Sequence, residues 1–175
     1  PERAPEPQGM KHTAWPVAFE EVLAARRRIR NFLAETPMRG YEALDAQVGH
    51  GIRVQVKHEN HNPTNAFKVR NAVAVLTSLR EKDKRRGVVA ASRGNHGLGL
   101  AWAGRALGVP VTVCVPVGNN PEKNAAIRGL DADLIEAGRD YDESVEAAEE
   151  CARKTGARVV HSTNEKQVIA GAGPI

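Results

Sequence analysis

Four short runs of apolar, mostly β-branched residues recur along the chain at nearly constant intervals. The runs begin at Val88, Val111, Leu134 and Val159, so that 23, 23 and 25 residues separate their starts. Each interval contains a segment with the apolar periodicity of a helix, and it leaves room for a crossover helix between parallel strands. The pattern predicts an α/β fold with a parallel sheet flanked by helices.

Residues that start and end helices lie where this fold requires them. We expect a helix from Phe19 to Leu33, and a half-buried strand from Ile52 to Lys57, where apolar and polar residues alternate. Asp140 with Glu143 resembles a capping box at a helix start. Pro121 lies where the first turn of a helix is expected. Three glycines suited to helix ends are Gly108, Gly129 and Gly156. Ligands of parallel sheets bind in the strand-to-helix loops, so functional residues are expected there.

Composition excludes several classes of protein. Hydrophobic residues make up 41% of the chain and charged residues 26%, and no apolar run is long enough for a membrane helix. The 25 basic and 21 acidic residues give a formal charge of +4, but aromatic residues are only 4%, which disfavours a nucleic-acid platform. The densest basic run, Arg80 to Arg86, is interpreted as the solvated end of a helix. We therefore expect neither a nucleic acid nor a membrane as partner.

The cysteines and the amino end predict a cellular compartment. Cys114 lies in a predicted buried strand and Cys151 in a predicted amphipathic helix, without the C-x-x-C spacing of a zinc or redox site. This indicates a reducing, cytoplasmic compartment. Residues 1–16 lack the apolar stretch of a secretory signal, and their prolines favour a flexible arm.

The first loop of chemical interest runs from Asn62 to Ala72 and has the sequence NPTNAFKVRNA. Its polar and turn residues lead directly into Phe67 and Lys68, which places a lysine at the entrance of a predicted helix. There the helix dipole disfavours an ammonium, and partial burial beside Phe67 would lower the lysine pKa further. These conditions make a lysine nucleophilic, whereas a lone lysine at a helix start is otherwise a solvated side chain.

The second loop follows the run at Val88 and reads ASRGNHGLGLA. Its glycines permit a tight turn, and its polar side chains add donors at a helix N-terminus, so that an anion site is predicted. These residues are Gly94, Gly97 and Gly99, and Ser92, Asn95 and His96. A dinucleotide site is disfavoured, because the glycine order is G-x-x-G-x-G and the following strand ends without an acidic residue for a ribose. A turn that only packs helix on strand is the remaining alternative.

Together the two loops resemble two motifs of one enzyme family. NPTNAFKVRNA is similar to the cofactor-lysine motif, and ASRGNHGLGLA to the asparagine-loop motif, of the fold-type II pyridoxal-phosphate enzymes, specifically the threonine and serine dehydratases. The similarity continues through the proline-lysine loop, the YDE helix start and the VIAG segment, and covers nearly everything from Arg53 onward. The resemblance implies the α/β fold of that family, which is like that of the tryptophan synthase β-subunit.

The resemblance also implies a role for each matching residue. Lys68 would form an aldimine with pyridoxal 5'-phosphate and later move the Cα proton of the substrate, and Phe67 would be a wall against the pyridine ring. Asn95 would donate a hydrogen bond to the ring oxygen of the cofactor. The substrate carboxylate would be held by Ser92, Gly94, Asn95 and His96. Gly97 would keep this loop tight.

The implied activity is removal of ammonia from L-threonine or L-serine, a small-molecule amino-acid substrate, to give a 2-oxo acid. Arg93 stands where family members that racemise serine have a second serine, which disfavours racemase activity. Four alternatives within the family stay open: a hydroxyaspartate dehydratase, a hydroxyectoine-breakdown dehydratase, a β-replacement enzyme and a serine racemase.

The resemblance further implies a division of the chain. After the arm of residues 1–16, residues 17–60 and 162–175 would be parts of a large domain that is incomplete in this chain. Residues 61–161 would form the cofactor-lysine segment and a small α/β domain. In the family, the cradle for the cofactor phosphate and the partner of the pyridine nitrogen follow this region. We therefore expect a homo-oligomer or a complementary carboxy-terminal half as partner, and the alternative to an enzyme is a non-catalytic half-module.

Other candidate sites are less favoured. His58 and His61 flank Glu59 at a spacing that can bind a metal, but the sequence offers no third ligand, so polar loop residues are the favoured interpretation. Cys114 is interpreted as a small core residue rather than a nucleophile.

Overall fold

The centre of the molecule is a four-stranded parallel sheet with the strand order β5-β4-β3-β6. The computed structural model describes residues 16–175, so the arm predicted for residues 1–16 lies outside the described residues, apart from Pro16. The strands are β3 (Val88–Ala91), β4 (Val111–Val115), β5 (Asp133–Glu136) and β6 (Arg158–Val159). Val88 pairs with Val111 on one side and with Arg158 on the other. The parallel α/β sheet predicted from the spacing of the apolar runs is confirmed.

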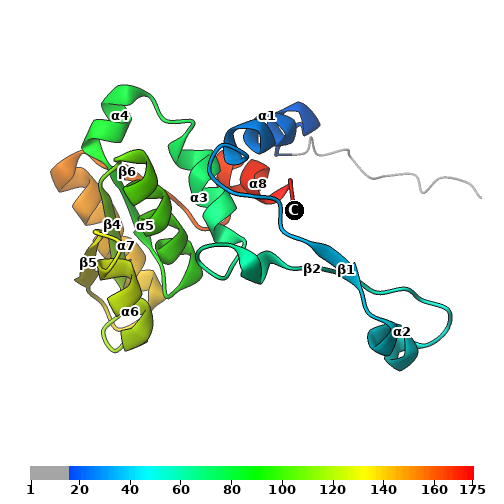
Figure 1. Cartoon of the computed structure of the whole chain (residues 1–175). Coiled ribbons are helices and arrows are strands. Elements are labelled where there is room, and N and C mark those ends of the chain that lie inside the picture. Colours follow the sequence, from blue (N-terminus) through cyan, green and yellow to red (C-terminus); the bar gives the residue numbers. More distant parts are fainter. Residues whose placement is uncertain (1–15) are drawn as a thin grey trace, which may run out of the picture.

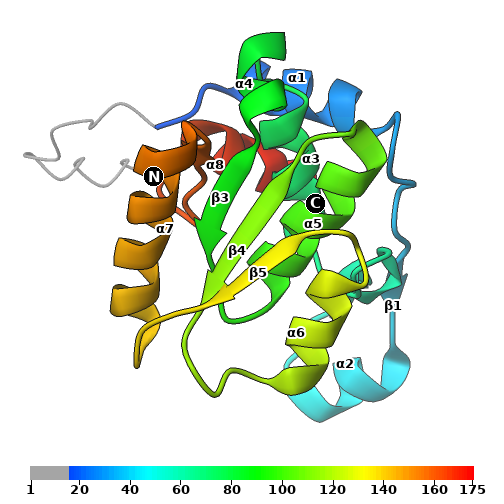
Figure 2. The same ribbon diagram turned by 90° about the vertical axis from the view of Figure 1, so that its left-hand side faces the viewer.

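Helices cover both faces of this sheet (Figure 2). Helix α7 (Tyr141–Thr155) packs on one face, and α5 (Asn95–Leu107) and α6 (Pro121–Arg128) lie on the other. The apolar side of α7 faces the strands through Val145 and Ala148, because charged residues fill its opposite side. Among the described residues, no helix combines the length and the apolar character needed to cross a membrane.

The helix ends predicted at the three glycines and the helix start predicted at Asp140 are confirmed in position, with two differences in detail. Gly108 and Gly156 end α5 and α7 in the left-handed conformation, whereas Gly129 follows α6 with a right-handed helical φ of −65°. At the start of α7, the Asp140 side chain accepts a hydrogen bond from the Glu143 backbone N–H at 3.0 Å. The Glu143 carboxylate accepts from the Arg139 backbone N–H instead of that of Asp140, so only half of the predicted capping box forms.

Helix α3 (Lys68–Leu76) lies between α5 on one side and α8 (Lys166–Ala172) and α1 (Phe19–Ile29) on the other (Figure 1). Every residue of α3 after Lys68 is buried. Two glycines allow this close packing. A Cβ added at Gly99 of α5 would lie 2.9 Å from the Lys68 carbonyl oxygen, and one at Gly171 of α8 would lie 2.8 Å from the Ala74 Cβ. Any larger residue would therefore push α5 or α8 away from α3.

The segment between α1 and α3 differs from the predictions. Strands β1 (Met38–Gly40) and β2 (Gln55–Lys57) form an antiparallel pair that projects from the body, with α2 (Glu42–Val48) at its far end (Figure 1). The strand predicted for Ile52–Lys57 forms only over its last three residues. Strand β1 and helix α2 have no buried residue, so they lack the apolar pattern by which sequence reveals an element.

Helix α1 ends at Ile29 instead of the predicted Leu33. Leu33 is nevertheless buried, because the chain turns after Ile29 and the Leu33 N–H still donates to the Ile29 carbonyl oxygen at 2.9 Å. An apolar residue at helical spacing therefore reaches the core from a turn, which the apolar periodicity alone does not distinguish from a longer helix.

The basic run also forms a different element from the predicted one. Residues Glu81–Arg86 are a separate short helix, α4, and are not the end of α3. The Thr77 and Ser78 hydroxyls donate to the Val73 and Val75 carbonyl oxygens at 2.5 and 2.7 Å, which satisfies the end of α3. The side chains of the run are exposed or half-buried, and two ion pairs join them within α4 and its cap, so the run is solvated as predicted.

A buried ion pair ties the base of the projecting hairpin to α3. Glu59, in the 3-10 helix η1 (Glu59–His61), accepts hydrogen bonds from Arg70 Nε at 2.7 Å, Thr36 Oγ1 at 2.5 Å and Asn62 Nδ2 at 2.8 Å. Arg70 on α3 is only 4% exposed. Because Thr36 precedes β1 and Asn62 begins the lysine loop, one carboxylate orders three segments around α3.

Candidate active site

The two loops that the sequence indicates meet beside a single short segment, residues 160–162. Lys68 Nζ, at the start of α3, donates a hydrogen bond to the Ser162 carbonyl oxygen at 2.8 Å. His96 Nε2, at the start of α5, lies 3.2 Å from the Val160 carbonyl oxygen. This segment follows β6, at the carboxyl edge of the sheet where parallel sheets bind ligands.

Lys68 has the electrostatic setting that the sequence predicts for it. Partial burial lowers the pKa of the Lys68 amine below its usual value. Its Nζ lies 5.2 Å from the centroid of the Phe67 ring, and Phe67 is 37% exposed. The amine is therefore easier to deprotonate than a surface lysine, and an open aromatic face lies beside it.

The asparagine loop is shaped from inside by Ser92. The Ser92 hydroxyl oxygen accepts hydrogen bonds from the backbone N–H groups of Gly97 at 2.8 Å and Gly94 at 3.2 Å. A Cβ at Gly97 would lie 2.7 Å from a methyl carbon of Val113, so Gly97 keeps the loop against the sheet. The Ser92 hydroxyl therefore orders the turn through these two hydrogen bonds. Ser92 is only 5% exposed, and its contact with a substrate carboxylate stays a prediction.

Backbone donors remain at the start of α5. Among residues 16–175, the backbone N–H groups of Asn95 and His96 have no hydrogen-bond acceptor. Unpaired N–H groups in a first helical turn point toward the ligand side and favour an anion. The predicted anion site therefore rests on backbone groups more than on the side chains of the loop.

His96 lies beneath the loop instead of on its open side. Its ring is 5% exposed, and Nδ1 is buried without a partner among the described residues. Burial, with a smaller contribution from the nearby Lys68 charge, lowers the pKa of His96 to about 4. The imidazole is therefore neutral at physiological pH, and it supports residues 160–162 through Val160. Its predicted contact with the substrate carboxylate stays a prediction.

Asn95 is exposed, and it bonds to Lys123, to which no role was assigned from the sequence. Its Oδ1 accepts a hydrogen bond from Lys123 Nζ at 3.2 Å. Both side chains line a groove of about 590 Å³ that is bounded by residues 63–65 of the lysine loop and by α5 and α6. Two sequence signals could have marked Lys123: it lies two residues after the helix-initiating Pro121, and it belongs to the proline-lysine loop of the family resemblance.

The other candidates do not gather into a site. His58 Nε2 lies 2.6 Å from the Tyr41 hydroxyl, and the His58 and His61 ring centroids are 5.4 Å apart. Across residues 16–175, no three His, Cys, Asp or Glu side chains form a group that could hold a metal ion. Cys114 is buried, and this burial raises its thiol pKa to about 11, as befits a core residue.

Comparison with known proteins gives this geometry a family. The model of the pyridoxal-phosphate dependent enzymes matches residues 29–175. The chain belongs to this family. The resemblance that the lysine and asparagine loops indicated is thereby confirmed.

Several similar proteins are named threonine ammonia-lyases or dehydratases. The chain is 37% identical over 159 residues to L-threonine ammonia-lyase of Thermotoga maritima, and the match covers 91% of this chain and 39% of that protein. It is 32% identical over 163 residues to a catabolic L-threonine dehydratase of Staphylococcus aureus, with 93% and 47% covered. The structure of serine racemase from Dictyostelium discoideum matches with a TM-score of 0.83 and 27% identity, over 90% of this chain and 50% of that one. The chain thus spans about half the length, or less, of these relatives.

The described residues fit the cofactor of this family. Pyridoxal phosphate carries an aldehyde that reacts with an amine, a flat ring and an anionic ring oxygen. Lys68 supplies an amine of lowered pKa, and Phe67 supplies an aromatic face 5.2 Å from it. Asn95 supplies an exposed amide at the start of α5.

The low pKa of His96 predicts a pH dependence of stability. Unfolding returns the imidazole to a pKa near 6.5, so between pH 6.5 and about 4 the unfolded chain binds more protons than the folded chain. The free energy of unfolding should therefore fall as the pH falls through this window, by on the order of 3 kcal/mol. Urea unfolding at a series of pH values measures it.

His96→Gln should flatten this slope, because glutamine does not titrate. His50→Asn, which removes an exposed histidine of the hairpin, serves as the control and should retain the slope of the parent. Equal slopes for the parent and His96→Gln would show that another group titrates in this range.

Proposed function

We propose that this chain supplies the cofactor lysine and the small α/β domain of a pyridoxal-phosphate-dependent ammonia-lyase, which releases ammonia from L-threonine, L-serine or both and leaves a 2-oxo acid. The observation that carries the proposal is the partly buried Lys68 amine, which lies beside the open Phe67 ring and bonds to the segment that His96 supports. The names of the Thermotoga maritima and Staphylococcus aureus relatives favour threonine as substrate.

Each described residue has a defined task in this proposal. When bound, the cofactor supplies an electron-withdrawing ring that acidifies the Cα–H bond of the substrate. Lys68 holds the cofactor through Nζ and, once released from it, accepts the Cα proton, which its lowered pKa favours. Phe67 covers one side of the site. The free N–H groups at the start of α5 bind the substrate carboxylate.

Elimination is favoured over racemisation by Arg93. Racemisation requires a second acid/base on the face of the substrate opposite Lys68, whereas elimination needs one base and a leaving group. Arg93 is exposed in the asparagine loop, and a guanidinium offers hydrogen-bond donors and no acceptor. It can steady an anionic group, but it does not accept a proton there.

A second candidate, a non-catalytic half-module, is favoured by the projecting hairpin. Met38, Leu44, Val48 and Ile52 are all more than 40% exposed on it. A lone two-stranded hairpin with uncovered apolar side chains is marginal in water, so this unit is suited to contact with further polypeptide. Because the match covers only 39–47% of the curated relatives, we propose that catalysis requires a complementary carboxy-terminal half.

The visible absorbance of bound cofactor separates these two candidates. Purified chain mixed with pyridoxal phosphate should become coloured if it is sufficient by itself. Colour that develops only after addition of a polypeptide equivalent to the unmatched half of the relatives would identify a half-module.

Substitution of Lys68 tests the proposed enzyme. In the catalytically complete form, Lys68→Ala should lower ammonia release from L-threonine by at least about 10³-fold, because both the cofactor attachment and the base are removed. Circular dichroism should show an unchanged fold, since Lys68 is the one residue of α3 that is not buried. Lys154→Ala on the solvated side of α7 is the matched control. Comparable ammonia release by Lys68→Ala and the parent would end the assignment.

Product stereochemistry tests the role of Arg93. With L-serine as substrate, the complete form should yield ammonia and pyruvate with little D-serine, as measured by chiral chromatography. Arg93→Ser restores the hydroxyl of the racemising relatives and should raise the share of D-serine. Accumulation of D-serine by the parent as fast as pyruvate would show that another group serves the second face.

A further inference from the structure

We propose that Lys123 is a positioning residue of this site, which fixes the Asn95 side chain so that its amide N–H groups face the cofactor. The inference rests on the proposed function, in which Asn95 contacts the ring oxygen of pyridoxal phosphate. It adds a residue from a third loop, after β4, to the two loops that hold Lys68 and Asn95.

The start of α6 gives Lys123 a rigid base. Asn120 caps the helix, and its Oδ1 accepts a hydrogen bond from the Lys123 backbone N–H at 3.0 Å. Beneath it, Asn119 Nδ2 donates to Asn124 Oδ1 at 2.7 Å, and both of these side chains are buried. Pro121 fixes φ in the first turn. The Asn120 cap, the buried Asn119–Asn124 hydrogen bond and the proline therefore fix the backbone of the helix turn that carries Lys123.

The chemistry of the contact decides which end of the amide remains free. A lysine ammonium has three donors and no acceptor, so the Asn95 atom that faces it at 3.2 Å has to be the carbonyl oxygen. The amide nitrogen, Nδ2, then points elsewhere, and among residues 16–175 it donates no hydrogen bond. An anionic ring oxygen requires a donor, and the reversed amide would present a carbonyl oxygen that repels it.

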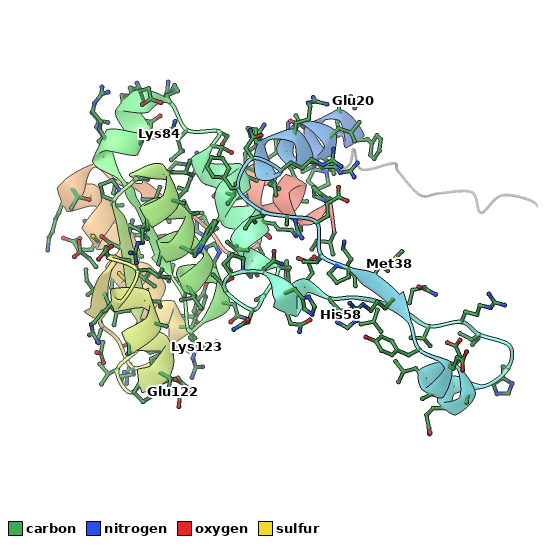
Figure 3. All side chains as sticks on the ribbon, viewed as in Figure 1. Glu20, Met38, His58, Lys84, Glu122 and Lys123 are labelled. Atoms are coloured by element: carbon green, nitrogen blue, oxygen red, sulfur yellow. The ribbon has the colours of Figure 1, made fainter. Side chains whose placement is uncertain are left out.

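Among the described residues, the Lys123 ammonium forms no ion pair with a carboxylate. Within the described part of the chain, no carboxylate lies within ion-pair distance of its Nζ, although Glu122 is its neighbour. Figure 3 shows both side chains on α6, at the end of the body away from Lys84. Lys84 instead pairs with Glu81 at 2.7 Å, so Lys84→Met is a matched control that removes a lysine far from Asn95.

The first test uses the cofactor-free chain and nitrogen-15 NMR. Lys123→Met removes the donor, so the cross-peaks of the Asn95 side-chain NH₂ group should move, and Lys123→Arg should hold them near the parent positions. Lys84→Met should leave them unchanged. Unmoved Asn95 side-chain signals in Lys123→Met would overturn the inference.

The second test uses the catalytically complete form with pyridoxal phosphate. Loss of one oriented hydrogen bond should weaken cofactor binding in Lys123→Met about fivefold and weaken its visible absorption band, with rescue by Lys123→Arg. Equal affinity and an equal band in the parent and Lys123→Met would overturn the inference alone. A parent that takes up no cofactor at Lys68 would overturn the proposed function, and the cofactor-free spectra would still decide the contact.

Discussion

The close packing of α3 is the constraint on which the rest of the structure depends. Eight of the nine residues of this helix are buried, and only Lys68 at its first position is not. Gly99 and Gly171 let α5 and α8 approach the α3 backbone to a distance that no side chain would permit. The position of Lys68 is thereby fixed by the packing of the whole helix that it begins.

Electrostatics at the site follow from this burial. The partly buried Lys68 amine loses hydration, so its pKa falls. The neutral His96 imidazole supports the same segment at Val160 without adding a second charge beside Lys68. The site therefore combines a nucleophilic amine, an aromatic face and free helix N–H groups, which suits a cofactor with an aldehyde, a flat ring and an anionic oxygen.

The sequence was informative where local chemistry decides the structure. The parallel sheet and its helix ends are predicted by apolar runs, a proline and glycines. The lysine and asparagine loops are recognised because polar and turn residues lead directly into a helical segment in each. Strand β1 and helix α2 escaped prediction because neither contains a buried residue, so neither gives a periodic apolar signal. The Lys123 contact escaped because it joins residues 28 positions apart, and the burial of His96 depends on tertiary packing with Val160.

The central claim is that Lys68 is the residue that binds pyridoxal phosphate. Reduction with borohydride after addition of the cofactor, in the catalytically complete form, converts any imine bond between them into a stable one. Peptide mass spectrometry should then find the pyridoxyl mass on the peptide that contains Lys68, and on no other lysine in comparable amount. A label spread over exposed lysines, or its absence from Lys68 in coloured protein, would contradict the account.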